Sequence, residues 1–257
     1  MHPSSAAPNP RDTAERDGGS RLNCLSTWGR ATAKYGARRR NAMKVGILGS
    51  GDVGRALGTG FAARGHDVKI ASRSPKNATI EKWLKEAKGR VSSGTFAEAA
   101  AHGEIVVLAV LGEAAEKAID MAIPKNFDGK VVIDATNPLD FSKGMPPGLF
   151  VGTTDSLGER IQRKLPEARV VKCFNIVGNA NMVDPKVPGG PPDMIIAGND
   201  AEAKKKVTAI LKEFGWPGAI DAGGIDGSRY LEAMVPLWVR VCTSLGTWNV
   251  AWKALRG

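Results

Sequence analysis

The glycine-rich turn at residues 49–54 has the spacing of a phosphate-binding loop, and it reads Gly49-Ser50-Gly51-Asp52-Val53-Gly54. In this pattern Gly49 permits a tight turn, Gly51 lets the backbone approach a pyrophosphate without an intervening Cβ, and Gly54 allows close packing of a helix on a strand. The N-terminus of that helix would offer unpaired N–H groups and a positive dipole end to the phosphates. We therefore predict that residues 49–54 bind a dinucleotide.

The elements around this turn support the prediction. An apolar run at 45–48 is typical of a buried strand, and an amphipathic segment from Arg55 to about residue 64 is typical of a helix. A second apolar run, at 67–71, follows at the distance that a βαβ unit requires. A glycine motif alone is weak evidence, but one between a strand and a helix is more specific.

The residues after the second predicted strand indicate which dinucleotide is bound. An NAD-specific fold commonly has an acidic residue here for the ribose hydroxyls, whereas this chain has Ser72, Arg73 and Lys76. Arg73 and Lys76 would attract a 2′-phosphate, and Ser72 would add a hydroxyl donor. We therefore expect NADP(H) rather than NAD(H).

The rest of the chain alternates between strand and helix signals. Continuous apolar runs at 104–110, 130–134 and 169–174 indicate central parallel strands covered on both faces. We predict an α/β fold, a Rossmann-type doubly wound parallel sheet with a short, mainly helical C-terminal part. Val110, Asn137 and Asn175 follow strand ends and would lie at the carboxyl edge of the sheet, where ligands of this fold bind. Each asparagine could bind a ligand or simply terminate its strand.

Three segments divide the chain. Residues 1–42 are rich in Pro, Ser, Gly and Arg and are predicted to be a disordered basic leader, either a targeting segment or a dispensable tail before Met43. Residues 43–222 form the predicted NADP-binding domain. Residues 223–257 include a helical pattern over 229–255, which we expect to pack on the domain or on a dimer partner.

Composition narrows the possible partners and the compartment. The formal net charge is +10, but residues 1–42 contribute half of it, and no interleaving of aromatic and basic residues suggests nucleic acid. Neither a nucleic-acid nor a membrane partner is expected. Three separated cysteines, Cys24, Cys173 and Cys242, favour a reducing compartment, and we predict a cytoplasmic protein. No residues have metal-ligand spacing, and the three histidines receive no role.

The motifs together resemble a known family. GSGDVG, ASRSPK, VVIDATNP, VVKCFN, AGNDAEAKKKV and DAGGIDGSRYLEAMVPLW occur in this order. They are similar to those of the NADPH-dependent reductases of the deazaflavin coenzyme F-420, and equally to the oxidoreductase domain of the six-transmembrane ferric reductases. The resemblance implies a Rossmann domain, often a homodimer, that transfers hydride between NADPH and a flavin-like ring. The chain departs from the deazaflavin reductases after the predicted strand at 104–110, where Leu111-Gly112-Glu113 replaces a proline-aromatic motif.

The resemblance also implies roles for individual residues. Those for the cofactor are Ser50, Gly51, Asp52 and Val53 at the pyrophosphate, Ser72, Arg73 and Lys76 at the 2′-phosphate, and Val110, Asn137 and Asn179 at the nicotinamide side. Those that would face the acceptor substrate are Phe174, Asn175, Ile176, Val177, Gly223 and Gly224.

Hydride transfer between stacked rings requires proximity and orientation more than proton transfer. We therefore expect an NADPH-dependent oxidoreductase that uses coenzyme F-420, FMN or FAD as acceptor and has no dedicated acid or base. One alternative is an imine or keto-acid reductase of the β-hydroxyacid dehydrogenase type, which normally has a longer helical domain. A second alternative is an NADPH-binding module without catalysis.

Overall fold

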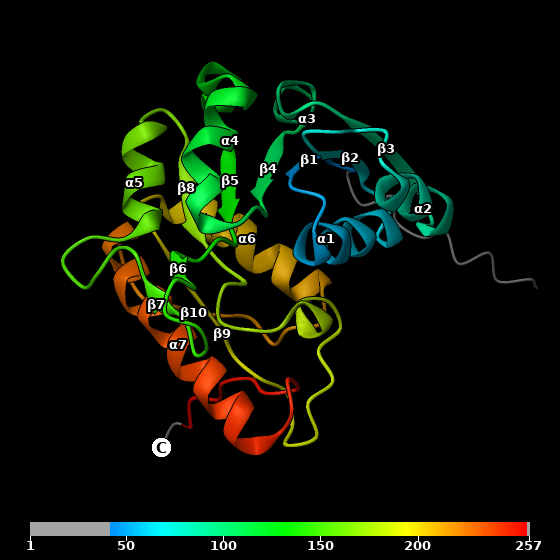
Figure 1. Cartoon of the computed structure of the whole chain (residues 1–257). Coiled ribbons are helices and arrows are strands. Elements are labelled where there is room, and N and C mark those ends of the chain that lie inside the picture. Colours follow the sequence, from blue (N-terminus) through cyan, green and yellow to red (C-terminus); the bar gives the residue numbers. More distant parts are fainter. Residues whose placement is uncertain (1–41, 256–257) are drawn as a thin grey trace, which may run out of the picture. The chain divides into compact units, whose positions relative to one another are not determined.

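The computed structural model describes residues 42–255, and the leader predicted for 1–42 lies outside this range apart from Ala42. One mixed sheet forms the centre of the described part (Figure 1). Its eight strands are β1 (Lys44–Leu48), β2 (Asp67–Ala71), β3 (Arg90–Gly94), β4 (Ile105–Leu108), β5 (Val131–Asp134), β8 (Arg169–Lys172), β9 (Met194–Gly198) and β10 (Ala219–Asp221). A separate hairpin joins β6 (Leu139–Asp140) to β7 (Gly148–Leu149).

Helices connect the strands. The α-helices are α1 (Asp52–Ala63), α2 (Ala78–Glu86), α3 (Phe96–His102), α4 (Ala115–Ala122), α5 (Leu157–Lys164), α6 (Ala201–Glu213) and α7 (Ser228–Leu245). Short 3-10 turns are η1 (Gly112–Ala114), η2 (Pro124–Phe127), η3 (Asn179–Asn181) and η4 (Ile225–Gly227).

The strand order is β10-β9-β8-β5-β4-β1-β2-β3, and every pair from β8 to β3 is parallel. This is the order of a Rossmann fold, in which the chain passes from one side of β1 to the other between β3 and β4. The predicted α/β fold class is therefore confirmed. The carboxyl ends of β1 and β4 meet at this switch point, which is where dinucleotides bind.

The sheet is not parallel throughout, because β9 runs antiparallel to β8, with Lys172 opposite Ala197. β10 is parallel to β9, so it is reversed as well. The carboxyl ends of these two strands therefore point away from the carboxyl edge formed by β1, β4, β5 and β8. An apolar run looks the same in either direction, and for this reason the sequence did not reveal the reversal.

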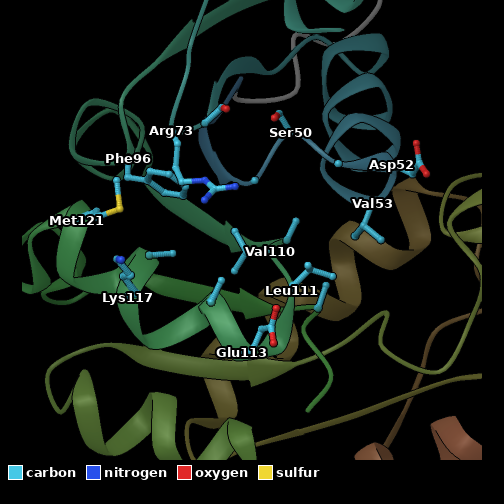
Figure 2. Close-up of a pocket in the computed structure, with 17 residues that line it drawn as sticks. Ser50, Asp52, Val53, Arg73, Phe96, Val110, Leu111, Glu113, Lys117 and Met121 are labelled. Carbon is cyan, nitrogen blue, oxygen red and sulfur yellow. The ribbon is translucent and has the colours of Figure 1, made fainter. Parts of the chain in front are cut away.

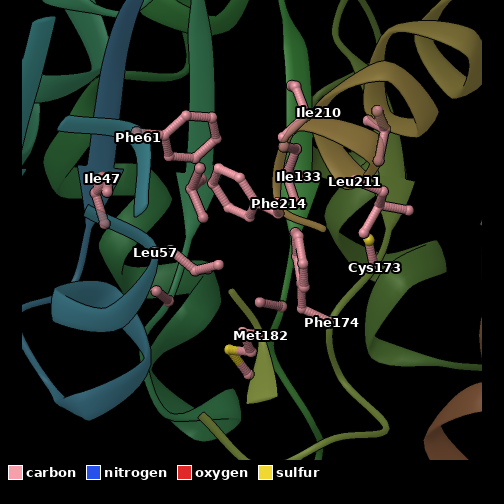
Figure 3. Close-up of a cluster of buried hydrophobic side chains, with 14 of the residues drawn as sticks. Ile47, Leu57, Phe61, Ile133, Cys173, Phe174, Met182, Ile210, Leu211 and Phe214 are labelled. Atoms are coloured by element: carbon pink, nitrogen blue, oxygen red, sulfur yellow. The ribbon is translucent and has the colours of Figure 1, made fainter. Parts of the chain in front are cut away.

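Apolar side chains cover both faces of the sheet. One face packs against α3, α4 and α5, and the other packs against α1, α2 and α6. Figure 3 shows the apolar cluster between the sheet and α1, α2 and α6, in which Phe61 and Phe174 both contact Phe214 from opposite sides. Phe61 comes from α1 and Phe214 directly follows α6, so this cluster joins the two halves of the chain.

Four strands and α-helices were absent from the sequence prediction, namely β3, α3 and the two short strands β6 and β7. β3 lies at the edge of the sheet and reads RVSSG, without a sustained apolar run. α3 has only seven residues, but it begins with a capping box. In this box Glu98 N donates to Thr95 Oγ1 and Thr95 N donates to Glu98 Oε2. The T-x-x-E spacing was therefore the signal available in the sequence.

The C-terminal helix is shorter than predicted. α7 ends at Leu245 because Gly246 adopts a left-handed conformation, with φ of 63°, and residues 246–255 are not helical. The chain then turns back along α7, where the indole N–H of Trp238 donates to the carbonyl oxygen of Val250 at 2.8 Å. α7 itself packs on α5 and β9 of the domain.

No helix within residues 42–255 is sufficiently long and apolar to span a membrane.

Candidate cofactor site

The glycine turn between β1 and α1 has the backbone that its sequence predicts. Gly49 has a φ of 123°, and a Cβ there would lie 2.2 Å from the carbonyl oxygen of Ala109. A Cβ on Gly54 would lie 2.0 Å from the carbonyl oxygen of Gly49. A Cβ on Gly51 would meet nothing within 4 Å. Gly49 and Gly54 are therefore required by the fold, whereas the space above Gly51 is available to a ligand.

The N-terminus of α1 is open for an anion. Its N-cap residue is Gly51, so no side chain caps the first N–H groups of the helix. Asp52, in the first turn, would repel a phosphate, but its carboxylate accepts a hydrogen bond from Arg55. The same guanidinium donates to the carbonyl oxygen of Ser50 and so holds the turn in place. Uncapped N–H groups and a partly neutralised carboxylate fit a pyrophosphate.

A cavity of about 540 Å³ lies over this turn (Figure 2). Its wall includes eight of the twelve residues predicted for the cofactor, namely Gly49, Ser50, Gly51, Asp52, Val53, Ser72, Arg73 and Val110. Gly54 lies beneath it, for the packing reason given above. Lys76 is exposed and does not line the cavity.

The end of β2 supplies the polar group expected for a 2′-phosphate. Arg73 is exposed, and its guanidinium has no hydrogen bond or ion pair with any residue in 42–255. Figure 2 shows its guanidinium directed into the cavity. Ser72 Oγ accepts a hydrogen bond from Ser74 N at 3.2 Å, which fixes the turn after β2. A charged and unpaired guanidinium here agrees with a phosphate ligand.

The opposite wall consists mostly of residues that the sequence motifs did not indicate, apart from Leu111 and Glu113 of the Leu111-Gly112-Glu113 segment. They come from the end of β4 and from η1 and α4, with Phe96 from α3 and Ala135 from the end of β5. The set is Phe96, Ala109, Leu111, Glu113, Ala114, Lys117, Ala118, Met121 and Ala135. Glu113, Lys117 and Met121 are four residues apart, so helical spacing could have grouped them. Which helix face meets the cavity depends on how α4 packs, and the sequence does not specify this.

The predicted asparagines meet each other at the carboxyl edge. Asn137 Nδ2 donates to the carbonyl oxygen of Asn175 at 2.9 Å, and Asn175 Nδ2 donates to Asn137 Oδ1 at 3.0 Å. Asn175 Nδ2 also donates to the carbonyl oxygen of Leu231 in α7. Asn175 Oδ1 is buried and has no donor among the described residues. The pair therefore joins the ends of β5 and β8 to α7 and leaves one buried acceptor atom unsatisfied.

The other residues predicted to face the acceptor do not line the cavity. Phe174 is fully buried and packs on Phe214, so its side chain belongs to the core. Ile176 and Val177 are also buried. Gly223 and Gly224, also predicted to face the acceptor, follow the reversed strand β10 at the far edge of the sheet and do not line the cavity, so their role stays a prediction. Five strand spacings separate β10 from β1, which is on the order of 24 Å.

Asn179, predicted at the nicotinamide side, lies in a shallower hollow along α1. That hollow also includes Asp52, which lines the large cavity, so Asn179 lies beside the N-terminus of α1.

A buried group of charges lies below the asparagines. Lys172 Nζ is 2.7 Å from Asp134 Oδ2 and 2.7 Å from Glu232 Oε1, and all three side chains are almost completely buried. Burial disfavours the charge on Lys172, but the two carboxylates outweigh this effect and raise its pKa. Glu232 also accepts hydrogen bonds from the N–H groups of Leu157 and Gly158. Lys172 therefore links the sheet, the N-terminus of α5 and α7.

Comparisons with known proteins agree with this geometry. A family model described as "NADP oxidoreductase coenzyme F420-dependent" matches residues 44–138, the segment from the start of β1 to the residue before β6. The F420-dependent NADP reductase of Methanothermobacter marburgensis is 31% identical over 210 residues, which cover 77% of this chain and 92% of that protein. Metalloreductase STEAP3 of Rattus norvegicus is 29% identical over 205 residues, which cover 77% of this chain and 38% of that protein.

A solved structure has the same fold over its whole length. It is a protein from Arthrobacter sp. FB24, provisionally described as an F420-dependent NADP reductase. It is 41% identical, has a TM-score of 0.80, and covers 84% of this chain and 100% of its own. The uncapped α1 N-terminus, the unpaired Arg73 and these relatives lead to one conclusion. The chain belongs to the family of F420-dependent NADP reductases and is an NADP-dependent oxidoreductase.

Proposed function

We propose that this protein transfers hydride between NADP(H) and a deazaflavin of the coenzyme F420 type, with the acceptor at the carboxyl edge of the sheet beside Asn137. When bound, NADPH supplies the hydride that the acceptor ring takes up. The observation that supports the proposal most directly is the cavity over the glycine turn, with Arg73 unpaired at one end. The names of the relatives supply the class of acceptor.

The cavity wall favours binding and orientation over proton chemistry. Its charged residues are Asp52, Arg73, Glu113 and Lys117, and it includes no histidine, cysteine or tyrosine. Asp52 is paired with Arg55, and Arg73 lies at the end where a 2′-phosphate is expected. We therefore infer that the residues of this wall position the two rings and that no side chain acts as a dedicated acid or base.

The carboxyl edge offers a place for the reacting rings. Leu111, at the end of β4, is 69% exposed, so an apolar side chain stands free where a ring could pack. The unsatisfied Oδ1 of Asn175 would accept a hydrogen bond from a ligand amide. These two features support an acceptor that is planar and has amide groups, as flavin-like rings do.

An anaerobic assay tests the proposed acceptor. NADPH oxidation is followed by nicotinamide absorbance with coenzyme F420, FMN, FAD, a ferric chelate or a cyclic imine as the only acceptor. Turnover with coenzyme F420 that exceeds the rate with every other acceptor supports the proposal. Faster turnover with the imine would favour the β-hydroxyacid dehydrogenase type of reaction. NADPH binding without turnover on any acceptor would leave only the binding module.

We also propose that the protein acts as a homodimer through α7. Tyr230, Leu237 and Leu245 are 71%, 54% and 65% exposed and recur on one face of this helix. Phe141, Met145 and Phe150 are exposed around the β6–β7 hairpin, which contacts α7. Exposed apolar side chains gathered on one helix and on the hairpin beside it are typical of an interface.

We also propose a cytoplasmic location. Cys173 and Cys242 are free, which supports a reducing, cytoplasmic setting.

A further inference from the structure

The wall of the cavity opposite the glycine turn brings a second cation to the adenosine end. Lys117 is on α4, one turn before Met121, and both line the cavity. Figure 2 shows Lys117 and Met121 on the same side of the cavity as Phe96, with Arg73 beside them. This end therefore combines two cationic side chains from different elements with an aromatic ring and a thioether.

We propose that Lys117 is a second cationic ligand of the 2′-phosphate of NADPH, acting from α4 across the cavity from Arg73, while Phe96 and Met121 enclose the adenine. The inference rests on the use of NADP(H) and adds a residue that determines the preference for it. It is independent of the identity of the electron acceptor.

The charges at this end fit a phosphate monoester. Lys117 is exposed and, like Arg73, has no hydrogen bond or ion pair of its side chain within the described range. Two nearby cations are already engaged, since Arg55 pairs with Asp52 and Lys164 pairs with Asp120. A phosphate monoester has about two negative charges near neutral pH, so two unpaired cations would balance it.

Lys117 takes the place that the sequence motif assigned to Lys76. Lys76 was expected to be the second cation, but it does not line the cavity. The ends of β2 and β4 lie on either side of β1, so they are separated by roughly 10 Å. Long side chains that extend from β2 and from the helix after β4 can meet across such a distance. Arg73 and Lys117 are therefore placed to contact one phosphate from two sides.

The proposal is tested by titrating wild type, Lys117→Met, Lys117→Arg and Lys125→Met with NADPH and with NADH. Lys125 is also exposed but lies outside the cavity, so Lys125→Met is a control for the same change in net charge. Lys117→Met should raise the Kd for NADPH about tenfold and change the Kd for NADH by less than about twofold. Lys117→Arg should retain most of the affinity, and Lys125→Met should change neither Kd.

Three results would overturn the proposal. If Lys117→Met weakens NADPH and NADH equally, Lys117 acts on the shared part of the dinucleotide. If it weakens neither while wild type still prefers NADPH, the cofactor assignment stands and Lys117 has no part in it. If wild type itself binds NADPH and NADH equally, the preference for NADP(H) fails, and the proposal for Lys117 fails with it. Circular dichroism of each variant verifies that it is folded.

Discussion

Replacing Lys172 with methionine should destabilise the protein strongly, although Lys172 does not line the cofactor cavity. Methionine is similar in length and removes only the charge and its hydrogen bonds. The change leaves Asp134 and Glu232 as buried carboxylates without their cation. Asp134 would keep the hydrogen bonds from Thr136, and Glu232 would keep those from the N–H groups of α5.

The expected loss follows from the cost of an unpaired buried charge. Breaking a buried ion pair by removing one partner costs about 3–5 kcal/mol, which is a large part of the roughly 5–15 kcal/mol that stabilises a typical domain. With an m-value of about 2 kcal/mol/M in urea, the unfolding midpoint should fall by about 1.5–2.5 M. Adding Asp134→Asn should recover part of this loss, because asparagine keeps an acceptor for Thr136 and removes one of the two uncompensated charges.

Urea unfolding followed by circular dichroism measures the loss, with Lys125→Met as the control, for which we expect a change within about 0.5 kcal/mol.

The pH dependence of the stability provides a second check. Because the folded state raises the pKa of Lys172, its contribution is fully present below the pKa of the unfolded chain, about 10.4, and is lost only as the pH rises through the folded value. The difference between wild type and Lys172→Met should therefore be constant between about pH 7 and pH 9. A loss below about 1 kcal/mol, a loss that shrinks over this pH range, or a double variant no more stable than the single one would refute the reasoning.

Three further predictions test other parts of the structure. Gly51→Ala should leave the unfolding temperature unchanged but raise the Kd for NADPH about tenfold or more, because the new Cβ would occupy the space left for the ligand. Gly54→Ala should instead cost about 1–3 kcal/mol of stability, because a Cβ on Gly54, unlike one on Gly51, would meet the backbone. Hydrogen bonds from Arg163 lower the pKa of Asp155 to about 2, so the stability difference between wild type and Asp155→Asn should be constant above about pH 5 and disappear as the pH falls from about 4 to 2 in an acid titration. Leu237→Asp should convert a dimer to a monomer in size-exclusion chromatography with light scattering while NADPH affinity is retained, and an unchanged mass would exclude this face of α7 as the interface.

The part of the site that could be predicted depends on local backbone requirements. Gly49 and Gly54 each avoid a collision with backbone atoms, so the sequence pattern and the geometry are tightly linked. Arg73 could be predicted because the end of β2 has a fixed place in a Rossmann fold. Lys117 could not, because the cavity face of α4 is set by packing that involves distant residues. Lys172 ends an apolar strand, a position where a lysine is usually exposed, and its two carboxylates lie 38 residues before and 60 residues after it in the chain.

Strand direction limited the prediction in the second half of the chain. The run at 194–198 has the composition of a buried strand, and composition does not distinguish a parallel from an antiparallel neighbour. The direction depends on the path of the long connection between β8 and β9, which contains η3 and many Pro and Gly residues. Because of this reversal, the Gly223-Gly224 turn lies away from the cavity although its sequence resembles a loop at the site.

The buried charges and the proposed acceptor site share the same elements, which gives the second half of the chain a definite role. Asn175 joins the ends of β5 and β8 to α7 at the carboxyl edge. The three residues before it, Lys172, Cys173 and Phe174, are buried in the core. Glu232, one residue after the α7 carbonyl that Asn175 contacts, is held by Lys172 and by the N-terminus of α5. The position of α7 relative to the carboxyl edge is therefore fixed by charges at the sheet. The first half of the chain contains the glycine turn and Arg73 of the candidate cofactor site, and the second half fixes the helix that borders the proposed acceptor site.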